Sequence, residues 1–467
     1  MALSSKVRIH EISRINPSTY SPKPTKKSSS PLTFFDIFWF NLPPVDYVLF
    51  YQLTKSASTP SYFYSEIVPK LKQSLSLALL HYLPLAGKLK YWQSDSPKPI
   101  ILYTPNDEVS LTIAESNARN FDTLSSNDEI HKANELHPLV SELMISDDTA
   151  AMMSLQITLF PGQGFCIGLK IHHVVADGKG TAMFIKSCGH LFKQYYSSKS
   201  KYYLPPDLIP FLDRSVVKSP AELDLSEVAS LRSLQEYSVP GDLVRATFEL
   251  SCNDIKKLKQ KALESSNSGK LHHLSTFVLA YAYTDMARAS PLPMTYFGNC
   301  VMAFKSSAKA KDFMDGINGY SFAVNMIGYL VNQVNNGVKG TSQNHVSTLS
   351  SISNPDPGTL FVTIFGSPQL EIYGSDFGLG RLKKVEIVSI DHRSRAISMT
   401  ESRDGSGGIE VGLALKKGEM NKFIASFISD GFEKHLNYIL SDGREGEVKE
   451  RRRNKELAYP YLGNSRL

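Results

Sequence analysis

Residues 165–192 constrain the fold more than any other part of the chain. Their first stretch, Phe165-Cys-Ile-Gly-Leu-Lys-Ile171, places apolar side chains at alternate positions, which is typical of a half-buried strand. The pair Asp177-Gly178 then indicates a sharp turn, and residues 181–192 have the wider apolar spacing of a helix packed on one face. The segment therefore predicts a strand, a short loop and a helix in direct succession.

His173 and Asp177 lie in this loop, at the tip of the predicted strand. An imidazole with a pKa near neutrality can take a proton from a hydroxyl or amine that attacks a carbonyl, and can pass it to the leaving group. Two other interpretations need no catalysis, because Asp177 could cap the following helix and His173 could be a hydrogen-bonded strand-end residue. A metal site formed by His172, His173 and Asp177 is disfavoured, since neighbouring strand residues point to opposite faces.

The length and composition limit the class of protein. At 467 residues the chain is longer than one hydrophobic core usually serves, so two domains are expected. A net charge of +6 is compatible with an anionic substrate and is too small to argue for nucleic acid. The start of the sequence carries charges instead of an apolar signal core, and no apolar run approaches membrane-spanning length, so we expect a soluble, cytosolic protein with no membrane partner. The four cysteines lie far apart, which argues against a zinc site or a disulfide framework.

Other segments add helices and strands in mixed order. The patterns predict helices over residues 64–80, 253–265 and 419–432, and strands over 153–159 and 246–251. Residues 384–416 are interpreted as one β meander, because alternating apolar positions are separated by Asp-Gly and Gly-Gly pairs. The composition turns polar and proline-rich between residues 195 and 220, which is typical of a linker.

Several motifs occur along the chain in a fixed order. His173-Val-Val-Ala-Asp177-Gly178 and Asp376-Phe-Gly-Leu-Gly380 resemble the paired signatures of the plant BAHD acyl-CoA-dependent acyltransferases. Between them, Tyr296-Phe-Gly-Asn-Cys300 is similar to the signature of the branch that acts on flavonoid, anthocyanin and other phenolic glycosides. Supporting matches are Thr33-Phe-Phe-Asp36, Tyr82-Leu-Pro-Leu-Ala-Gly-Lys88, Asp213-Arg-Ser215 and residues 384–391 and 401–405. The His-x-x-x-D pattern is weak alone, whereas the ordered set is specific and outweighs the two non-catalytic interpretations of the loop.

The resemblance implies an α/β (α+β) fold of two chloramphenicol-acetyltransferase-like domains with mixed sheets, joined by a long crossover segment. We therefore expect an N-terminal domain over residues 1–194, a crossover linker over 195–222, a C-terminal domain over 223–440 and a basic, disordered tail over 441–467. A channel between the domains would bring acyl-CoA and the acceptor to the histidine from opposite sides. The resemblance also implies a monomer that uses acyl-CoA, malonyl-CoA first, as co-substrate and has no bound cofactor or metal.

The same resemblance distributes roles among the site residues. His173 is expected to be the general base, and Asp376 occupies the second position usually assigned to catalysis, although its neighbouring glycines indicate a loop-ordering role. Asp177 is implied to hold the loop by pairing with an arginine, for which Arg288 is the candidate. Further support of the site is expected from Gly178, Gly378 and Gly380, and weaker contacts to substrate or CoA from Lys179, Ser275, Thr276 and Leu379.

The sequence departs from the family pattern at two places. Leu379 stands where a tryptophan is usual, and residues 284–295 are shortened by about a strand's worth of residues, in the region that carries the family's arginine. The first expectation is transfer of a malonyl or related group to a sugar hydroxyl of a phenolic glycoside, with Lys179 as a candidate cation for the malonyl carboxylate. The alternatives are a hydroxycinnamoyl-CoA-dependent enzyme, which would use aromatic or apolar walls, and a catalytically weakened paralogue. An unrelated two-domain binding or metal protein would make the ordered motifs a coincidence.

Overall fold

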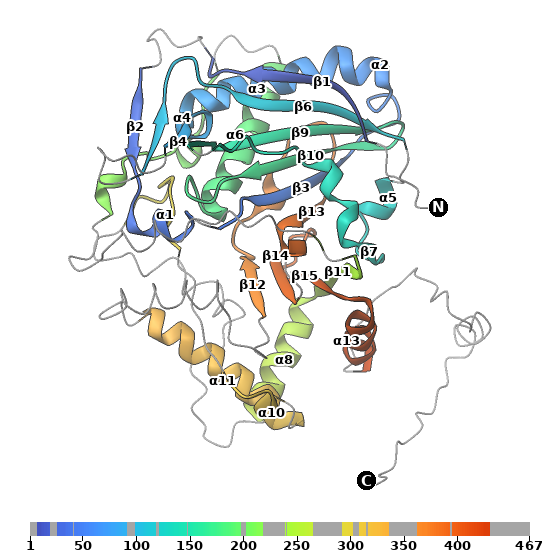
Figure 1. Ribbon diagram of the computed structural model, residues 1–467. Helices are drawn as coiled ribbons and strands as arrows, with labels where there is room; N and C mark the ends of the chain where they lie inside the picture. Colours follow the sequence, from blue (N-terminus) through green and yellow to red (C-terminus); the bar gives the residue numbers. More distant parts are fainter. Residues whose placement is uncertain are drawn as a thin grey trace.

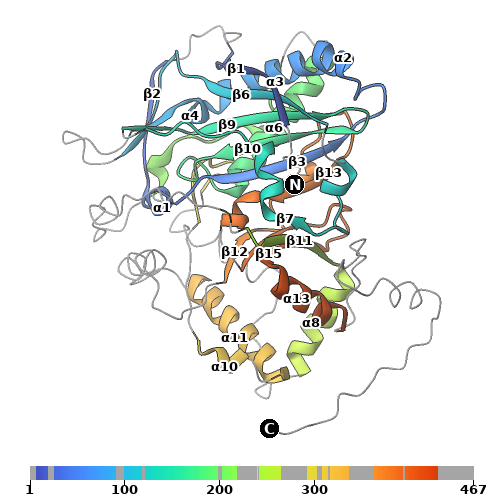
Figure 2. The same ribbon diagram turned by 45° about the vertical axis from the view of Figure 1, so that its right-hand side comes forward.

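The computed structural model describes two lobes, each built around a β-sheet (Figure 1). The described residues are 7–18, 26–40, 42–90, 99–117, 121–146, 148–197, 202–217, 239, 241–264, 292–301, 308–313, 316–335, 362–392 and 395–429. Figures 1 and 2 both place the large sheet with its helices at one end of the molecule and a second group of helices at the other. Within the described residues, no helix combines the length and apolar character needed to cross a membrane.

The large sheet holds the strand that leads to His173. Its strands run in the order β1 (Val7–Ile15), β6 (Val109–Ser116), β9 (Met153–Phe160), β10 (Gly164–Ile171), β3 (Val45–Gln52) and β13 (Leu382–Ile387). Neighbours are antiparallel except for the parallel pair of β6 and β9, so the sheet is mixed. The strands predicted over 153–159 and 165–171 are confirmed as β9 and β10.

The expectation that residues 165–171 form a half-buried strand is wrong, because β10 is covered on both faces. Its odd-numbered side chains, Phe165 to Ile171, belong to the main core, and Cys166 belongs to a smaller core on the opposite face with Leu139. A Cβ atom at Gly168 would stand 1.9 Å from the carbonyl oxygen of Leu139. The covering segment thus approaches so closely that position 168 needs a glycine, and the lack of apolar side chains at 168 and 170 made the strand look half-buried in the sequence.

Two helices cover one face of the large sheet, as Figures 1 and 2 show. The helices α3 (Val68–His81) and α6 (Gly178–Tyr196) pack against each other, and their apolar side chains join the main core. These confirm the helices predicted over 64–80 and 181–192. The shorter helices in this lobe are α1 (Phe34–Phe38), α2 (Pro60–Tyr62), the π-helical turn Phe63–Ile67, α4 (Leu83–Ala86) and α5 (Phe121–Leu124).

The second sheet and the remaining helices form the other lobe. The strand order is β12 (Thr363–Gly366), β14 (Ala396–Glu401), β15 (Ile409–Lys416), β11 (Leu243–Leu250) and β7 (His131–Lys132), with β12 and β14 parallel. The helices are α8 (Cys252–Glu264), α10 (Ala310–Phe313), α11 (Gly316–Asn335) and α13 (Lys417–Ser429). The predicted strand over 246–251 and the predicted helices over 253–265 and 419–432 are confirmed. A third sheet runs β2 (Ser28–Pro31), β5 (Ile100–Tyr103), β4 (Lys88–Lys90) and β8 (Thr149–Ala151).

Residues 384–416 do not form the single meander that the sequence suggests. β14 and β15 form the predicted hairpin in the second sheet, whereas β13 pairs with β3 in the large sheet. The 3-10 turn Val388–His392 carries the chain from one sheet to the other. Alternating apolar residues predict that a segment is a strand, but they carry no information about which sheet it joins.

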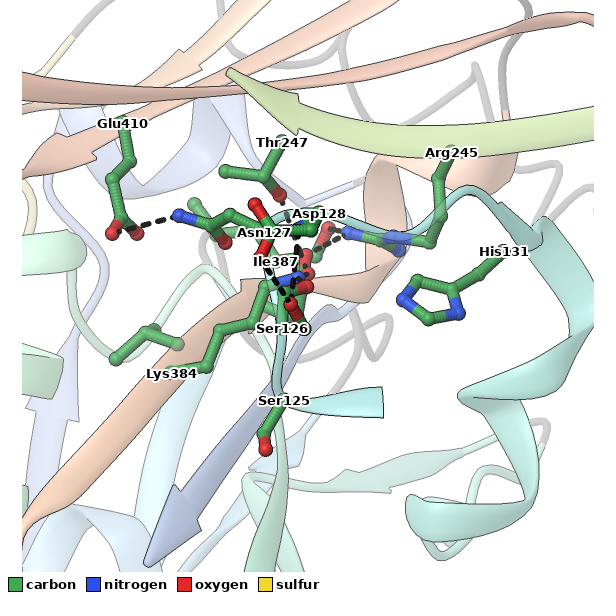
Figure 3. Close-up of polar contacts among 12 residues, drawn as sticks. Ser125, Ser126, Asn127, Asp128, His131, Arg245, Thr247, Lys384, Ile387 and Glu410 are labelled. Atoms are coloured by element: carbon green, nitrogen blue, oxygen red, sulfur yellow. Dashed lines mark hydrogen bonds and ion pairs between the residues drawn. The ribbon is translucent and has the colours of Figure 1, made fainter. Parts of the chain in front are cut away.

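Buried charges join the two lobes where the chain crosses between the sheets. Arg245 on β11 donates to Glu386 at 2.5 Å and to Asp391 at 2.8 Å, and Lys384 lies 2.5 Å from the other oxygen of Glu386. Figure 3 shows Arg245, Lys384 and Asn127 converging from β11, β13 and the segment before β7. We call Arg245, Lys384, Glu386 and Asp391 the Arg245 network. Burial disfavours the Glu386 carboxylate, but the two cations outweigh burial and lower its pKa to about 2.

The predicted linker is described over residues 195–197, which end helix α6 and are therefore not linker, and over residues 202–217. It contains the 3-10 turns Pro206–Leu208 and Arg214–Val216, and Phe211 between them bridges to Tyr296. The linker therefore lies beside the Tyr296-Phe-Gly-Asn-Cys300 motif. The whole predicted tail, residues 441–467, falls outside the described residues, as do residues 218–238, and the predicted domain boundaries stay predictions.

Candidate active site

A tight loop carries His173 from the end of β10 to the start of α6. His172 donates its N–H to the carbonyl of Met152 at 2.9 Å, and Val175 donates back to the carbonyl of His172 at 3.1 Å. Asp177 is the N-cap of α6, and its Oδ1 accepts the N–H of Gly180 at 3.0 Å. We call residues 172–177 the His173 loop. It is fixed at one end by the sheet and at the other by the helix.

Asn299 determines which nitrogen of His173 carries the proton. The Nδ2 of Asn299 donates to Asp36 Oδ1 at 2.9 Å and to the carbonyl of His173 at 2.8 Å. Its Oδ1, which can only accept, lies 3.0 Å from His173 Nδ1. Nδ1 therefore carries the proton, and the lone pair is on Nε2. No other described residue forms a hydrogen bond with Nε2, so the imidazole has the form that a general base requires.

Asp36 is the centre of the polar contacts that hold Asn299. It lies in α1, where its side chain and that of Thr33 form a capping box. Its Oδ2 accepts from Thr33 and, at 2.5 Å, from Arg214, and its Oδ1 accepts the backbone and side-chain N–H groups of Asn299. We call Asp36, Arg214, Asn299 and His173 the Asp36 network. Four of the motifs quoted from the sequence, far apart along the chain, meet in it.

Arg214 also holds the His173 loop directly. Its guanidinium donates to the carbonyl oxygens of Val174, at 3.3 Å, and Val175, at 2.7 Å. The side chain is buried and spans the gap between the loop and Asp36. An arginine thus braces the loop through its backbone, a role that the sequence did not reveal for this residue.

The indole of Trp39 lies flat against the imidazole of His173. The ring centroids are 3.7 Å apart and the ring planes differ by 6°. The indole Nε1 donates to the carbonyl of Val301 at 3.3 Å, and the residue is only 7% exposed. The ring face of His173 is therefore covered on one side, while Nδ1 is held at its edge.

Burial sets the charge of the two adjacent histidines. Burial lowers the pKa of His173 to about 4, although the Asn299 hydrogen bond and the Asp36 charge act in the opposite direction. Burial likewise lowers the pKa of His172 to about 4. Both rings are neutral at neutral pH, but His172 is fully buried whereas His173 is half-buried. Only His173 is placed to meet a substrate.

Asp177 ties the His173 loop to the Tyr296-Phe-Gly-Asn-Cys300 motif. Besides capping α6, its carboxylate accepts the N–H of Cys300 at 3.3 Å. Burial raises the pKa of this carboxyl group, and the surrounding N–H groups oppose the shift. The helix-cap interpretation is confirmed. The arginine predicted to pair with Asp177, Arg288, lies outside the described residues, and that pairing stays a prediction.

The structure does not bring Asp376 together with His173. Its carboxylate is 58% exposed, accepts from Lys193 at 3.0 Å and accepts the N–H of Gly378 at 2.7 Å. Lys193 lies 15 residues beyond Gly178 on α6, which corresponds to about 22 Å at the rise of an α-helix. The catalytic assignment of Asp376 stays a prediction, and the observed contacts are those of a residue that orders its own loop.

The glycines of this loop have backbone reasons to be glycine. Gly378 has φ +70°, and a Cβ atom on Gly380 would stand 1.8 Å from the carbonyl oxygen of Gln52. Leu379 between them packs at the margin of the main core.

The remaining predicted residues lie at different distances from the site. Gly178 begins α6, where an added Cβ atom would stand 3.0 Å from the side chain of Leu370. Lys179 is exposed on the first turn, at the helix end nearest His173. Ser275 and Thr276 lie outside the described residues.

Sequence reasoning gave no role to Trp39, Asp36, Arg214 or Asn299. The signal that could have found three of them was their position in the ordered motifs.

The sequence model described as the Transferase family matches residues 5–284 and 285–429. The match is divided between residues 284 and 285, at the edge of the region expected to be shortened. Phenolic glucoside malonyltransferase 1 of Arabidopsis thaliana is 40% identical, over 90% of this chain and 97% of its own length. A malonyl-CoA:anthocyanidin 5-O-glucoside-6''-O-malonyltransferase of the same plant is 38% identical, over 92% and 99%. Its agmatine coumaroyltransferase is 37% identical, over 90% and 98%.

Among solved structures, vinorine synthase shares the fold, with a TM-score of 0.57 at 17% sequence identity, over 91% of this chain and 98% of that chain. The predicted two-domain α/β fold with mixed sheets is confirmed by this likeness. The family match spans most of the chain, and the relatives are 37–40% identical over nearly their whole length. This chain therefore belongs to the Transferase family of BAHD acyltransferases and is an acyltransferase that uses acyl-CoA as co-substrate.

Proposed function

We propose that this enzyme transfers a malonyl group from malonyl-CoA to a sugar hydroxyl of a phenolic glycoside, with His173 as the general base. The observation that carries the proposal is the state of the imidazole. Asn299 holds the protonated Nδ1 at 3.0 Å, and the lone pair of Nε2 has no hydrogen-bond partner among the described residues. The lowered pKa of His173 keeps the ring unprotonated at neutral pH.

The reaction follows from that geometry. Nε2 takes the proton of the sugar hydroxyl while its oxygen attacks the thioester carbon, and a tetrahedral intermediate forms. Collapse of the intermediate breaks the C–S bond. The imidazolium then returns the proton to the CoA thiolate, which leaves as the free thiol, so atoms and charges balance without a covalent acyl-enzyme. Asn299 accepts from Nδ1 throughout, so the ring does not change tautomer during transfer.

Lys179 supports malonyl as the acyl group. It is exposed on the first turn of α6, two residues after Asp177 and at the helix end nearest His173. A carboxylate on the acyl group would be attracted by its ammonium, whereas Asp177 already accepts the N–H of Gly180 at this helix end. Two of the relatives named above are malonyltransferases, one for phenolic glucosides and one for an anthocyanidin glucoside.

A hydroxycinnamoyl donor is the second candidate. The relative named agmatine coumaroyltransferase is nearly as similar, at 37% identity, and its name specifies both an aromatic acyl group and an amine acceptor. A general base of the kind formed by His173 can deprotonate an amine as well as a hydroxyl. The choice between the two therefore rests on the donor and the acceptor, not on the base.

Purified enzyme should be assayed with malonyl-CoA and coumaroyl-CoA against a phenolic glucoside, an anthocyanin glucoside and agmatine, with products detected by mass. We expect the malonylated glucoside to dominate. A product formed only from coumaroyl-CoA would replace the proposal with the second candidate. No product from any pair would favour the weakened paralogue that the shortened 284–295 segment suggests.

The base is tested by His173→Ala. We expect kcat to fall about a hundred- to ten-thousandfold, which is the usual contribution of general base catalysis. His10→Ala, which removes a histidine from the edge strand β1, is the matched control and should leave kcat unchanged. Equal activity of the two variants would rule out His173 as the base.

The acyl group is tested by Lys179→Met. We expect kcat/KM for malonyl-CoA to fall about tenfold, since a charge-assisted contact is worth about 1.5–3 kcal/mol when partly desolvated. The value for acetyl-CoA, which has no carboxylate on the acyl group, should change less than twofold. A parallel loss with both donors would remove Lys179 from malonyl recognition.

A further inference from the structure

We propose that Trp39 is a positioning residue for His173, an inference that rests on the proposed role of His173 as the base. The indole and imidazole rings are nearly parallel, at 6°, with centroids 3.7 Å apart. Trp39 is almost fully buried, and its Nε1 is anchored on the carbonyl of Val301. A ring fixed in this way forms a flat wall against which the imidazole plane is set.

The short helix α1 holds the imidazole from two directions. Trp39 follows its last residue, and Asp36 lies three positions earlier, on the same side of the turn. Trp39 contacts the ring face, whereas Asp36 acts on the ring edge through the amide of Asn299. Rotating His173 about its Cβ–Cγ bond would break the stack and the Nδ1 hydrogen bond together. The direction of the Nε2 lone pair is therefore doubly determined.

The stack also affects the charge of the ring during transfer. The face of an indole carries the negative part of its quadrupole and attracts a cation placed over it. The imidazolium that forms when His173 takes the proton would be stabilised by Trp39, Asn299 and Asp36, while burial acts against it. Trp39 thus offsets part of the cost that burial places on the protonated base.

A geometric effect on the base should appear in kcat more than in KM. A misplacement of about 1 Å in a reacting group can lower the rate about a hundredfold. We therefore expect Trp39→Leu to lower kcat about ten- to a hundredfold, with KM for acyl-CoA within about twofold of the original. Trp39→Phe retains an aromatic face without the indole N–H, and we expect kcat to fall less than about threefold.

The charge effect supplies a readout that a purely structural role would not move. Loss of a desolvated cation–π contact, worth about 0.5–2 kcal/mol, should shift the acidic limb of kcat/KM in Trp39→Leu to lower pH by about half to one unit. Trp39→Phe should leave the limb in place. We expect the same difference between the two variants when the ring nitrogens of His173 are titrated by NMR in enzyme with labelled histidine: a lower pKa in Trp39→Leu and an unchanged pKa in Trp39→Phe. His173→Ala identifies the signal of His173 among the 12 histidines.

The outcomes separate this inference from the proposed function. If His173→Ala is inactive while Trp39→Leu keeps the original kcat and limb, the positioning role is wrong and the base stands. If His173→Ala remains active, the base assignment itself fails. If Trp39→Leu does not fold, the NMR titration of His173 in Trp39→Phe decides. The proposal requires that His173 keeps its Nδ1–H tautomer and its pKa in that variant. A tautomer or titration that differs in Trp39→Phe would contradict the view that an aromatic face is sufficient.

Discussion

The Asp36 network and the Arg245 network both bury an arginine against carboxylate oxygen, yet the two arginines are used differently. Arg245 binds two carboxylates, Glu386 and Asp391, and only one backbone carbonyl. Arg214 binds one carboxylate, Asp36, and donates its remaining N–H groups to two carbonyls of the His173 loop. Arg245 therefore neutralises two buried carboxylates, whereas Arg214 fixes the backbone of the His173 loop.

The networks also end differently. Each oxygen of Glu386 contacts a cation, and Lys384 also donates to the carbonyl of Ser126. The charged groups of the Arg245 network therefore bind partners from both lobes. The Asp36 network passes through a neutral amide to a neutral imidazole, whose Nε2 has no partner among the described residues. The difference indicates that charge pairing holds the lobes in register, whereas a chain of neutral hydrogen bonds leaves Nε2 available for the proposed role of His173 as the base.

The largest effect is expected when Arg245 is replaced. Arg245→Met leaves Glu386 and Asp391 buried without their main cation, which costs about 3–5 kcal/mol when a buried pair is broken. The free energy of unfolding in urea should fall by that amount. Because the Arg245 network does not contact His173, the kcat of the molecules that remain folded should change less than about twofold.

A surface ion pair provides the control for this variant. Lys193→Met removes an ion pair whose side chains are 45% and 58% exposed, and such pairs contribute about 0–1 kcal/mol. A small loss in Lys193→Met beside a large loss in Arg245→Met would support the comparison. Loss of less than about 1 kcal/mol in Arg245→Met would mean that water or rearrangement satisfies Glu386 and Asp391, and that the network does not hold the lobes.

The next effect is on catalysis and uses two buried asparagines as a matched pair. Asn299→Leu removes the acceptor for His173 Nδ1 while the backbone N–H to Asp36 remains. Losing control of the tautomer should lower kcat about ten- to a hundredfold, a share of the full effect of the base. Asn127→Leu makes the same change beside Glu410 in the region of Figure 3 and should alter stability alone. Equal kcat values for the two variants would contradict the role of Asn299.

A change of pH should affect the two networks at different points. The folded pKa of His173 is lowered to about 4, so the base stays unprotonated as pH falls through 6.5 and is lost only as pH approaches 4. The folded pKa of Glu386 is also lowered, to about 2, so its stabilising contribution is full above 4.5 and disappears as pH falls towards 2. We expect kcat/KM to decline near pH 4–5 while circular dichroism still reports the folded protein. An inflection between pH 6 and 7 would mean that burial does not control His173.

Much of the fold follows from local pattern. The strands β9 and β10 and the helices α3, α6 and α13 lie where apolar spacing predicts them, because each segment packs its apolar positions on a core. The placement of β13 could not be predicted in this way. Its partners are 331 to 340 positions away in the sequence, from Leu382 with Tyr51 to Ile387 with Tyr47. The buried Lys384 and Glu386 that accompany it have the pattern of ordinary polar positions on an exposed strand face.

The site was predictable only in part, for a related reason. His173 and the helix-cap interpretation of Asp177 came from residue type and spacing in one loop. Asn299, Arg214 and Asp36 lie in three separate segments, and their roles depend on which atoms meet after folding. The role of Trp39 is harder still to predict, since nothing in the sequence distinguishes a tryptophan stacked on an imidazole from one that fills a core.

The smallest effect is expected at Asp376, and it decides between the two roles that the sequence suggested. Asp376→Asn keeps a side-chain oxygen for the N–H of Gly378 and loses only the charge towards the exposed Lys193. We expect kcat within about twofold of the original and a stability loss below about 1 kcal/mol. Asp376→Ala, which also removes the acceptor that orders the loop at Gly378, should cost more of both. A collapse of kcat in Asp376→Asn comparable to that in His173→Ala would instead mean that catalysis requires the charge of Asp376. Its partner Lys193 lies about 22 Å along α6 from Gly178, so that result would contradict the assignment of proton transfer to His173 and of loop ordering to Asp376.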